Sequence, residues 1–374
     1  MTFIIDIIAF LIILGAVVLV HELGHFLAAK SAGVKVEEFG IGFPPKLWKK
    51  KIGETEYSIG AIPLGGFNKI YGMDEDDEKK EADPRGYDSK GAWAKFWICS
   101  AGIVMNILFA AIIFYGLLAS SGLKTSQALL FSDYKFPFGH QIDRPMIAQV
   151  EDNSPAAAAG LKSSDTIVAV NGEAVNGTEA FSQVINANRG ESVSLLLDSG
   201  KTVEVVPRLV VEKNQGPLGV ALREVAYLDY STNIADKIFA GFEHSWNIID
   251  YSFSALGRLV GSSFAEKSIE PLAYSMTGPV GIYAIIKVTL GNGWYNIMNL
   301  VAVLSIALGI SNLLPIPAMD GAKMIYTFLE AVNKKVFSKK LQMRIESYGA
   351  AFLILLAVAI IFKDFIQFKD IIFK

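Results

Sequence analysis

Four long apolar stretches constrain the fold of this 374-residue chain more than any other feature. A helix of about 20 apolar residues crosses the ~30 Å hydrocarbon core of a bilayer, so such stretches predict membrane-spanning helices. The composition agrees: 52% of the residues are hydrophobic and only 19% are charged, against about 25% charged in soluble domains. The predicted spans are residues 3–29, 96–118, 294–314 and 348–362.

The first span lies at the N-terminus, so a cleavable signal peptide is the alternative interpretation. The segment has no basic residue before it, and its apolar run is longer than that of a signal peptide. A cluster of His and Glu also stands where small residues would precede a cleavage site. These features favour a membrane helix.

Lysine and arginine in the connecting loops predict the orientation, because basic loops stay on the cytoplasmic side. The loop after the first span contains Lys30, Lys35, Lys46, Lys49, Lys50 and Lys51. The loop before the fourth contains Lys323, Lys334, Lys335, Lys339, Lys340 and Arg344. Both loops are therefore expected in the cytoplasm, with both termini and the central region outside. The C-terminal Lys363, Lys369 and Lys374 depart from the rule.

Charge and cysteine content exclude several classes of function. A net charge of −3 offers no basic surface for nucleic acid. The lone cysteine, Cys99, excludes an intramolecular disulfide framework and a cysteine-based zinc finger, and is expected to pack as an ordinary apolar residue.

The fold class predicted is a multi-pass α-helical membrane protein with four transmembrane helices, a membrane-associated β-loop and an inserted α+β domain. In the β-loop, strands at 55–59 and 67–71 are expected on either side of Pro63-Leu64-Gly65-Gly66, and the acidic stretch 74–88 is expected to be a solvated loop. The predicted segments are 1–30 (first span), 31–94 (cytoplasmic region with the β-loop), 95–120 (second span), 121–228 (inserted domain), 229–292 (interfacial linker), 293–321 (third span), 322–346 (cytoplasmic loop) and 347–374 (fourth span and tail).

The inserted domain shows strand and turn signals. Strands are predicted at 146–150, 166–170, 193–197 and 202–206, with turns at Asn171-Gly172 and at 198–201. Ser154 and Pro155 predict the start of a helix, with Gly160 after its end. In the linker, residues 234–260 have helical apolar spacing with many aromatics, which is typical of an interfacial helix and compatible with a segment that dips into the membrane.

His21-Glu22-Leu23-Gly24-His25, inside the first span, matches the pattern H-E-x-x-H. Residues four apart share one face of a helix, so both imidazoles can bind one metal ion. Glu22 is placed to act as a general base on a water at that metal. Hydrogen bonding of these side chains to a neighbouring helix is the structural alternative, but polar groups inside a membrane are costly unless paired or ligated.

A hydrolytic zinc site needs a third protein ligand, and Asp320 is the best candidate. It ends the stretch Asn312-Leu313-Leu314-Pro315-Ile316-Pro317-Ala318-Met319-Asp320, whose prolines exclude a regular helix. Irregular backbone at membrane depth is tolerated where it is buried or lines a cavity. Asp320 and the two histidines are all expected near the cytoplasmic ends of their spans, and the alternative for Asp320 is a helix cap at that surface. His140 and His244 lie in the outward-facing region and are poor candidates.

Residues 124–225 resemble a PDZ domain of the bacterial, permuted kind, on the strength of Ser154-Pro155-Ala156, Ala159-Gly160-Leu161 and Asp165 leading to Val170-Asn171-Gly172. The resemblance implies that the loop 216–220, with Gly219, offers backbone N–H groups to a peptide. A folded spacer that binds nothing is the alternative.

The H-E-x-x-H in the first span, the N-x-x-P-x-P-x-x-D-G in a later one and the PDZ-like domain between them resemble the site-2 protease family, most closely its bacterial four-span members. The resemblance implies zinc held by His21, His25 and Asp320, with Glu22 as general base. It also implies substrate contacts by Asn312, by Asn106 of a G-x-x-x-N pattern beginning at Gly102, and by the β-loop with Gly65 and Gly66. Two positions depart from the family pattern: Ile103 replaces a proline, and Ala322 replaces a glycine.

The function that this resemblance implies is intramembrane zinc endopeptidase activity in the bacterial cytoplasmic membrane. The expected partners are membrane lipid and the transmembrane segment of a pre-cleaved single-pass protein, such as an anti-sigma factor, or a signal-peptide remnant. The PDZ-like domain would act as a substrate size filter, and no nucleic acid is expected. The alternatives are a catalytically inactive, membrane-anchored PDZ adaptor or chaperone, and a transporter, which the absence of recognisable repeats disfavours.

Overall fold

The computed structural model describes residues 2–73, 83–211, 215–332 and 339–372. The chain forms two compact units, residues 1–117 with 259–374, and residues 118–258. The helices are α1 (Thr2–Ser31), α3 (Ala92–Ser120), α4 (Pro155–Ala158), α5 (Gly177–Ala187), α6 (Ile234–Glu266), α7 (Glu270–Ser275), α8 (Pro279–Leu290), α9 (Trp294–Leu313), α10 (Asp320–Val332) and α11 (Lys339–Ile372). The strands are β1 (Val36–Ile52), β2 (Thr55–Ile70), β3 (Lys124–Ala128), β4 (His140–Val150), β5 (Ile167–Val170), β6 (Glu173–Ala174), β7 (Val193–Leu197), β8 (Thr202–Val205) and β9 (Val220–Asp229).

In the first unit, α1, α3, α9 and α11 are long and apolar enough to cross a membrane, which confirms the predicted spans. The helix α11 extends well beyond the predicted 348–362 at both ends. Its flanking Lys, Gln, Arg and Glu residues are good helix formers, so the helix continues after the apolar run has ended.

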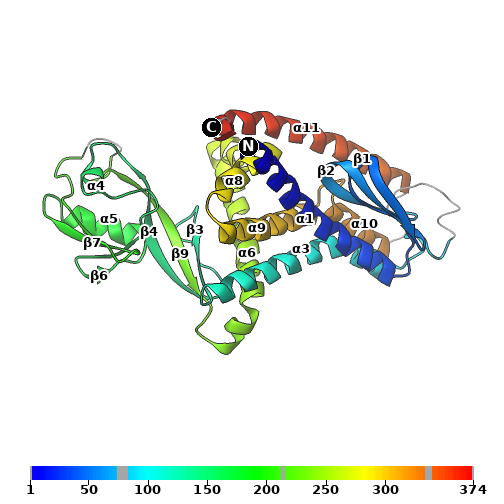
Figure 1. The fold of residues 1–374 in the computed structure, drawn as a ribbon, viewed down its shortest axis with the longest axis horizontal. Coiled ribbons are helices and arrows are strands. Elements are labelled where there is room, and N and C mark those ends of the chain that lie inside the picture. Colours follow the sequence, from blue (N-terminus) through cyan, green and yellow to red (C-terminus); the bar gives the residue numbers. More distant parts are fainter. Residues whose placement is uncertain (1, 74–82, 212–214, 333–338, 373–374) are drawn as a thin grey trace. The chain divides into compact units, whose positions relative to one another are not determined.

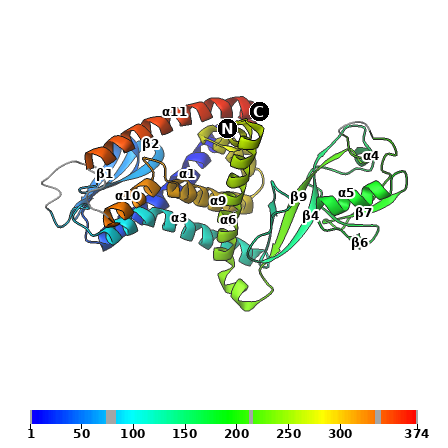
Figure 2. The ribbon, with the colours of Figure 1, turned by 180° about the vertical axis from the view of Figure 1, so that it is seen from behind.

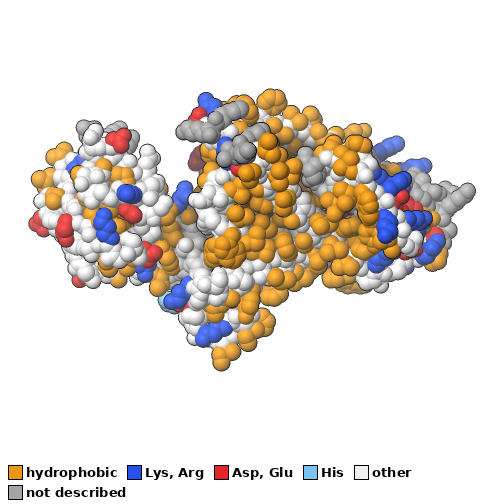
Figure 3. Space-filling view, viewed as in Figure 1, with side chains coloured by type: hydrophobic (Ala, Val, Ile, Leu, Met, Phe, Trp, Pro, Cys, Tyr) orange, Lys and Arg blue, Asp and Glu red, His pale blue; other side chains and the backbone are white. Residues whose placement is uncertain are grey.

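The surface of these helices is suited to lipid. Only 6% of the most apolar window of α11 is buried, and large side chains such as Phe352, Leu355 and Phe362 are exposed. An apolar surface of this extent is not stable in water. Figure 3 shows hydrophobic side chains along the helical unit, with charged side chains gathered at the end formed by β1 and β2. The first unit is therefore built as a membrane-embedded body.

The segment before the third span contains a helix that the sequence analysis missed. The short helix α8 lies within the predicted interfacial linker, and Ile286 on it packs with Val17 of α1 and Val301 of α9. The buried carboxylate of Asp364 in α11 accepts hydrogen bonds from the backbone N–H groups of Gly278 and Gly281, at 2.8 and 2.9 Å. This carboxylate satisfies backbone donors at the start of α8, which otherwise have no helical partner.

The β-loop is more continuous than predicted. β2 runs without a break from Thr55 to Ile70, so the stretch from Pro63 to Gly66 belongs to the strand instead of separating two strands. A bend allows its two halves to pair with opposite edges of β1: Phe39 pairs with both Tyr57 and Asn68. Gly65 supplies a backbone φ of +108° in this region, which a side-chain-bearing residue rarely adopts. Figures 1 and 2 both show this sheet at the same end of the first unit as α10.

The second unit contains two antiparallel sheets, in the orders β3-β9-β4 and β6-β5-β7-β8. Asn171 and Gly172 have positive φ angles between β5 and β6, and the residues after Leu197 turn into β8, which confirms both predicted turns. The hydroxyl of Ser154 accepts a hydrogen bond from the backbone N–H of Ala157 and caps α4, as predicted. Phe181 and Ile185 of α5 complete a core with the β5–β8 sheet.

Two remaining expectations concern the connecting segments. The helix predicted for 234–260 is present and continues as α6 to Glu266. The solvated loop predicted for 74–88 falls mostly outside the described residues, since the structure describes only 83–88 of it.

Candidate metal centre

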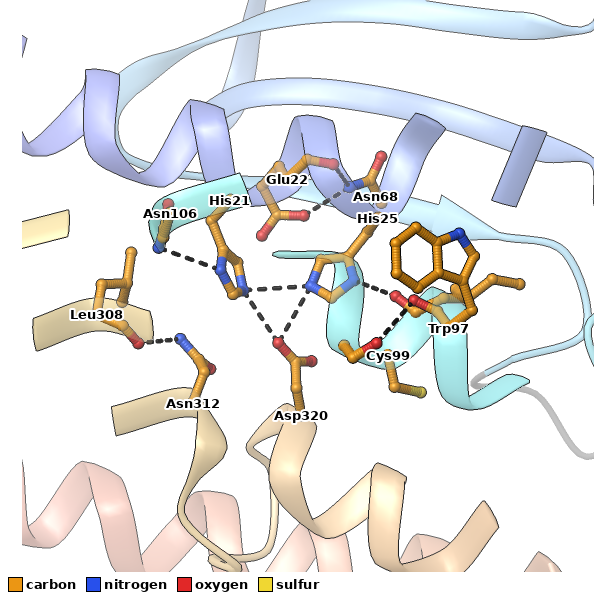
Figure 4. A network of polar contacts seen from close by, with 12 residues as sticks. His21, Glu22, His25, Asn68, Trp97, Cys99, Asn106, Leu308, Asn312 and Asp320 are labelled. Atoms are coloured by element: carbon orange, nitrogen blue, oxygen red, sulfur yellow. Dashed lines mark hydrogen bonds and ion pairs between the residues drawn. The ribbon is translucent and has the colours of Figure 1, made fainter. Parts of the chain in front are cut away.

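The last turns of α1 carry three polar side chains into the first unit. His21 and His25 are buried, with 5% and 7% of their surface exposed. Because they are four residues apart on a helix, their Nε2 atoms approach to 3.2 Å. Figure 4 shows both rings pointing toward Asp320.

Asp320 reaches the histidines because the chain bends between α9 and α10. Residues 314–319 are not helical, as the prolines predicted, and Ala318 has a φ of +71°. Gly321 keeps the bend tight, because a Cβ there would lie 2.4 Å from the carbonyl oxygens of Leu313 and Leu314. The Oδ2 atom of Asp320 consequently lies 3.0 Å from His21 Nε2 and 3.1 Å from His25 Nε2. The three predicted ligands therefore lie together in the structure.

These three atoms fit a zinc ion. Tetrahedral zinc with bonds of about 2.0–2.2 Å places its donor atoms roughly 3.3–3.6 Å apart, close to the 3.0–3.2 Å seen here. His25 Nδ1 lies 2.7 Å from the carbonyl oxygen of Ile98 and donates a hydrogen bond to it, which in the neutral imidazole leaves the lone pair on Nε2. That lone pair faces an anionic oxygen of Asp320, an arrangement that a cation relieves. Three protein donors leave a fourth position for reactants, as in catalytic zinc sites.

Helix α3 approaches the site unusually closely. A Cβ at Gly24 of α1 would lie 2.3 Å from the carbonyl oxygen of Ala101, and a Cβ at Gly102 of α3 would lie 2.4 Å from His25 Nε2. Only glycine at both positions allows the two helices to cross at this distance. The crossing brings α3 against both imidazoles.

Asn68 of β2 is a site residue that the sequence analysis missed. Its Nδ2 donates to the carbonyl oxygen of Glu22 at 2.6 Å and to Glu22 Oε2 at 2.7 Å. Gly66, two residues earlier on the same strand, packs against Glu22, because a Cβ there would lie 3.1 Å from Glu22 Cγ. The alternation of side chains along a strand is the signal in the sequence: Gly66 is a predicted substrate-binding position, and Asn68, two residues later, faces the same side of the strand.

The two asparagines predicted to bind substrate occupy different environments. Asn312, in the last turn of α9, lies beside the metal centre in Figure 4, and its Nδ2 donates to the carbonyl oxygen of Leu308. Asn106 is completely buried, and its Nδ2 lies 3.4 Å from His21 Nδ1. Burial leaves Asn106 no surface for substrate, so the structure opposes its predicted role.

In the second unit, the loop predicted to bind a peptide lies beside a cavity, and Gly219 forms the turn of that loop. Gly219 has a φ of +70° and turns toward Ser154, where a Cβ would meet Ser154 Cβ at 2.4 Å. A cavity of about 330 Å³ lies beside the same loop, but its lining residues do not include Gly219. They come mainly from α5, the loop and β9, among them Phe181, Ile185, Arg189, Gly216, Leu218 and Val220.

The other two histidines take no part in the metal centre. His140 begins β4, and His244 hydrogen-bonds through Nδ1 to the hydroxyl of Tyr230 at 2.9 Å. Burial lowers the pKa of His244 to about 4, so this residue stays neutral at physiological pH. Among the described residues, His21, His25 and Asp320 form the one cluster with metal-ligand geometry.

Comparison with known proteins gives a consistent result. The family model described as peptidase family M50 matches residues 9–356. A protein of Clostridium acetobutylicum, provisionally named a zinc metalloprotease, is 32% identical over 94% of each chain. The zinc metalloprotease RasP of Bacillus licheniformis is 28% identical, covering 96% of this chain and 98% of its own. The regulator of sigma-W protease RasP of Bacillus subtilis is 26% identical, covering 97% and 98%.

The family match covers most of the chain, the relatives are aligned over nearly their full lengths, and four helices are suited to spanning a membrane. The chain therefore belongs to peptidase family M50, the site-2 protease family, and is a membrane zinc metalloprotease.

Proposed function

We propose that this protease cuts the transmembrane segments of single-pass membrane proteins after their outer domains have been removed. The observation that carries the proposal is the burial of His21, His25 and Asp320 within a unit of apolar, membrane-length helices. The Bacillus subtilis relative is named for regulation of sigma-W. Anti-sigma-factor-like membrane proteins are accordingly the first substrate class, and signal-peptide remnants are a second.

The proposed site residues divide the chemistry among them. His21, His25 and Asp320 would hold the zinc ion, which would supply Lewis-acid polarisation of a peptide carbonyl and would lower the pKa of a bound water to about 7. Glu22 takes the proton from the attacking water and passes it to the leaving nitrogen. Asn68 holds Glu22 Oε2 by a hydrogen bond and leaves Oε1 available for the proton. Asn312 supports the substrate backbone from the opposite side.

A transmembrane helix must unwind before cleavage, because its amides are protected by internal hydrogen bonds. We propose that β2 holds the unwound segment by strand addition. Residues 66–70 pair with β1 along one edge, and none of the described strands pairs with the other edge. Because Asn68 lies on this half of β2, a substrate strand added here would pass beside Glu22.

In this proposal the second unit contains a PDZ domain that filters substrates by size. Its cavity between α5 and the loop before β9 is lined by apolar side chains, by polar Ser182, Asn186 and Gln215, and by Arg189, a mixture that suits an extended peptide with a free carboxylate. The metal ligands and Glu22 all lie in the first unit. The second unit therefore restrains cleavage and performs no chemistry.

Removing the core of the second unit should relax the size filter. Val150 of β4 pairs with Val220 of β9. Residues 151–219 can therefore be replaced by a short turn that preserves the β3-β9-β4 sheet. We expect the full chain to cleave a truncated substrate and to reject the same substrate with its outer domain. The shortened variant should cleave both at comparable rates, measured by gel analysis of purified proteins in liposomes. Loss of cleavage of the truncated substrate, in a folded variant, would refute the filter.

We further propose that the protein lies in the bacterial cytoplasmic membrane, with the metal centre toward the cytoplasm and the second unit outside. Accessibility labelling tests this orientation. Cys99 is fully buried, so a Cys99→Ala chain is a clean background. A cysteine at Lys50 should escape a membrane-impermeant maleimide in intact cells and react after permeabilisation, whereas one at Glu173 should react in both. Labelling of both positions in intact cells would refute the topology.

An inactive PDZ adaptor is the competing function, and the site argues against it. A scaffold needs neither a general base nor an amide that orients it, yet Glu22 and Asn68 are both present and hydrogen-bonded. Zinc-dependent cleavage by the purified wild-type protein decides between the two functions.

A further inference from the structure

One face of α3 supplies partners to both imidazoles. Ile98, Gly102 and Asn106 are spaced four residues apart, so they lie along one side of the helix. Ile98 accepts a hydrogen bond from His25 through its carbonyl oxygen, and Gly102 gives the rings room to approach. Asn106 stands opposite His21 Nδ1. The pattern suggests that each histidine has its own partner on α3.

The side-chain amide of Asn106 makes only part of the hydrogen bonds that it could make. Its Nδ2 lies 3.4 Å from His21 Nδ1, a long distance for a hydrogen bond, while its Oδ1 is buried without a partner in the described structure. The nitrogen and oxygen of an amide are nearly indistinguishable in shape, and their positions are assigned from the hydrogen-bond network. A half-turn of this amide would place Oδ1 beside His21 Nδ1.

We propose that Asn106 is a positioning residue whose Oδ1 accepts the hydrogen bond of His21 Nδ1–H. A metal-binding histidine coordinates through one ring nitrogen and donates the N–H of the other to an acceptor. His25 already follows this rule with Ile98. With Asn106 as acceptor, His21 adopts the same tautomer, and both Nε2 lone pairs point at the ion. The inference rests on the proposed metal ligands and replaces the predicted substrate contact of Asn106.

Helix α9 holds Asn106 in place. The hydroxyl of Ser305 donates to the backbone carbonyl oxygen of Asn106 at 2.9 Å, and both residues are completely buried. Gly309, one turn further along α9, also packs against Asn106: a Cβ there would lie in ordinary van der Waals contact with Asn106 Cβ, at 3.6 Å. The acceptor is thus fixed by packing, as a ligand-orienting group must be.

The test measures metal binding and needs no activity assay. Asn106→Leu keeps the approximate shape but removes the acceptor, and Asn106→Asp keeps acceptor oxygens while removing the donor. We expect Asn106→Leu to bind zinc about 10–100-fold more weakly in chelator competition and to change the visible spectrum of the Co²⁺-loaded full-length protein. Asn106→Asp should bind zinc at least as tightly as wild type. Asn296→Leu, an exposed change on α9, is the matched control and should have no effect.

The outcomes separate clearly. Wild-type affinity and spectrum in Asn106→Leu would overturn the proposal. So would weak binding by Asn106→Asp, because it would show that the amide acts as a donor or only fills space. If Asn106→Leu does not fold, the comparison of Asn106→Asp with wild type alone decides the matter. A wild-type protein that binds no zinc would instead refute the ligand assignment itself, so the two failures are distinguishable.

Discussion

Glu22→Gln should reduce peptide cleavage by about 10²–10⁴-fold, the usual contribution of a general base, while the protein still binds one zinc. Glutamine has the same shape but cannot accept a proton at neutral pH. Its amide oxygen can still receive the hydrogen bond from Asn68 Nδ2, so the geometry around the site should survive. Cleavage of a truncated single-pass substrate in liposomes and metal analysis of the same preparation provide the two measurements.

A matched control separates this effect from a general change of charge. Glu54 lies in the turn between β1 and β2 and pairs with Lys30 at the surface. Glu54→Gln should therefore retain cleavage within about twofold, as expected for a surface change away from the site.

The variant Glu22→Gln should also retain uncut substrate during purification, which would identify natural substrates. Wild-type rates in Glu22→Gln would show that Glu22 is not the base.

Asp320→Asn should lose both zinc and activity, the latter by more than about 100-fold, because changes in groups behind the ligands alone cost 10–100-fold. Asparagine caps a helix as well as aspartate does. The variant therefore tests directly whether Asp320 acts as a cap or as a ligand. In the wild type, Asp320 Oδ2 lies within 3.1 Å of both histidine Nε2 atoms. The neutral amide of asparagine cannot supply the same negative charge to a cation.

The measurement is zinc per chain after exchange into metal-free buffer, together with cleavage of the truncated substrate. Asp152→Asn, at an exposed position of the second unit, should keep about one zinc per chain and full activity. If Asp320→Asn kept its zinc and its activity, the third ligand would have to be sought elsewhere.

Local sequence patterns were sufficient to predict the spans and the cluster of His21, His25 and Asp320. The apolar runs are long enough to require a membrane, and the four-residue spacing of His21 and His25 places them together on any helix. The proline-interrupted stretch before Asp320 could only be irregular, and it had to be buried or line a cavity at that depth. In the second unit, the turn at Asn171 and the helix cap at Ser154 were predicted from local sequence as well, because each depends on one or two residues.

Features that depend on contacts between distant segments could not be predicted from the sequence. Asn68 became a partner of Glu22 because β2 bends and passes α1, which no spacing along the chain reveals. The sequence predicts a peptide-binding loop at 216–220, but only the structure shows that its neighbours Leu218 and Val220 line the cavity while Gly219 turns against Ser154. The helix α8 was missed because its 12 residues are too short for a span, and the carboxylate at its start comes from α11.

The sequence by itself determined the membrane class, because the length of an apolar run is a property of one short segment. Its motifs carried the resemblance to the protease family and named His21, His25 and Asp320 as candidate ligands. The tertiary structure alone decided how those ligands are held. Gly24 and Gly102 allow α1 and α3 to cross at a distance that brings Ile98 to His25 and Asn106 to His21. Hydrogen-bond partners are set by distances of about 3 Å between helices. Such distances follow from the packing of whole helices, which motif spacing does not encode.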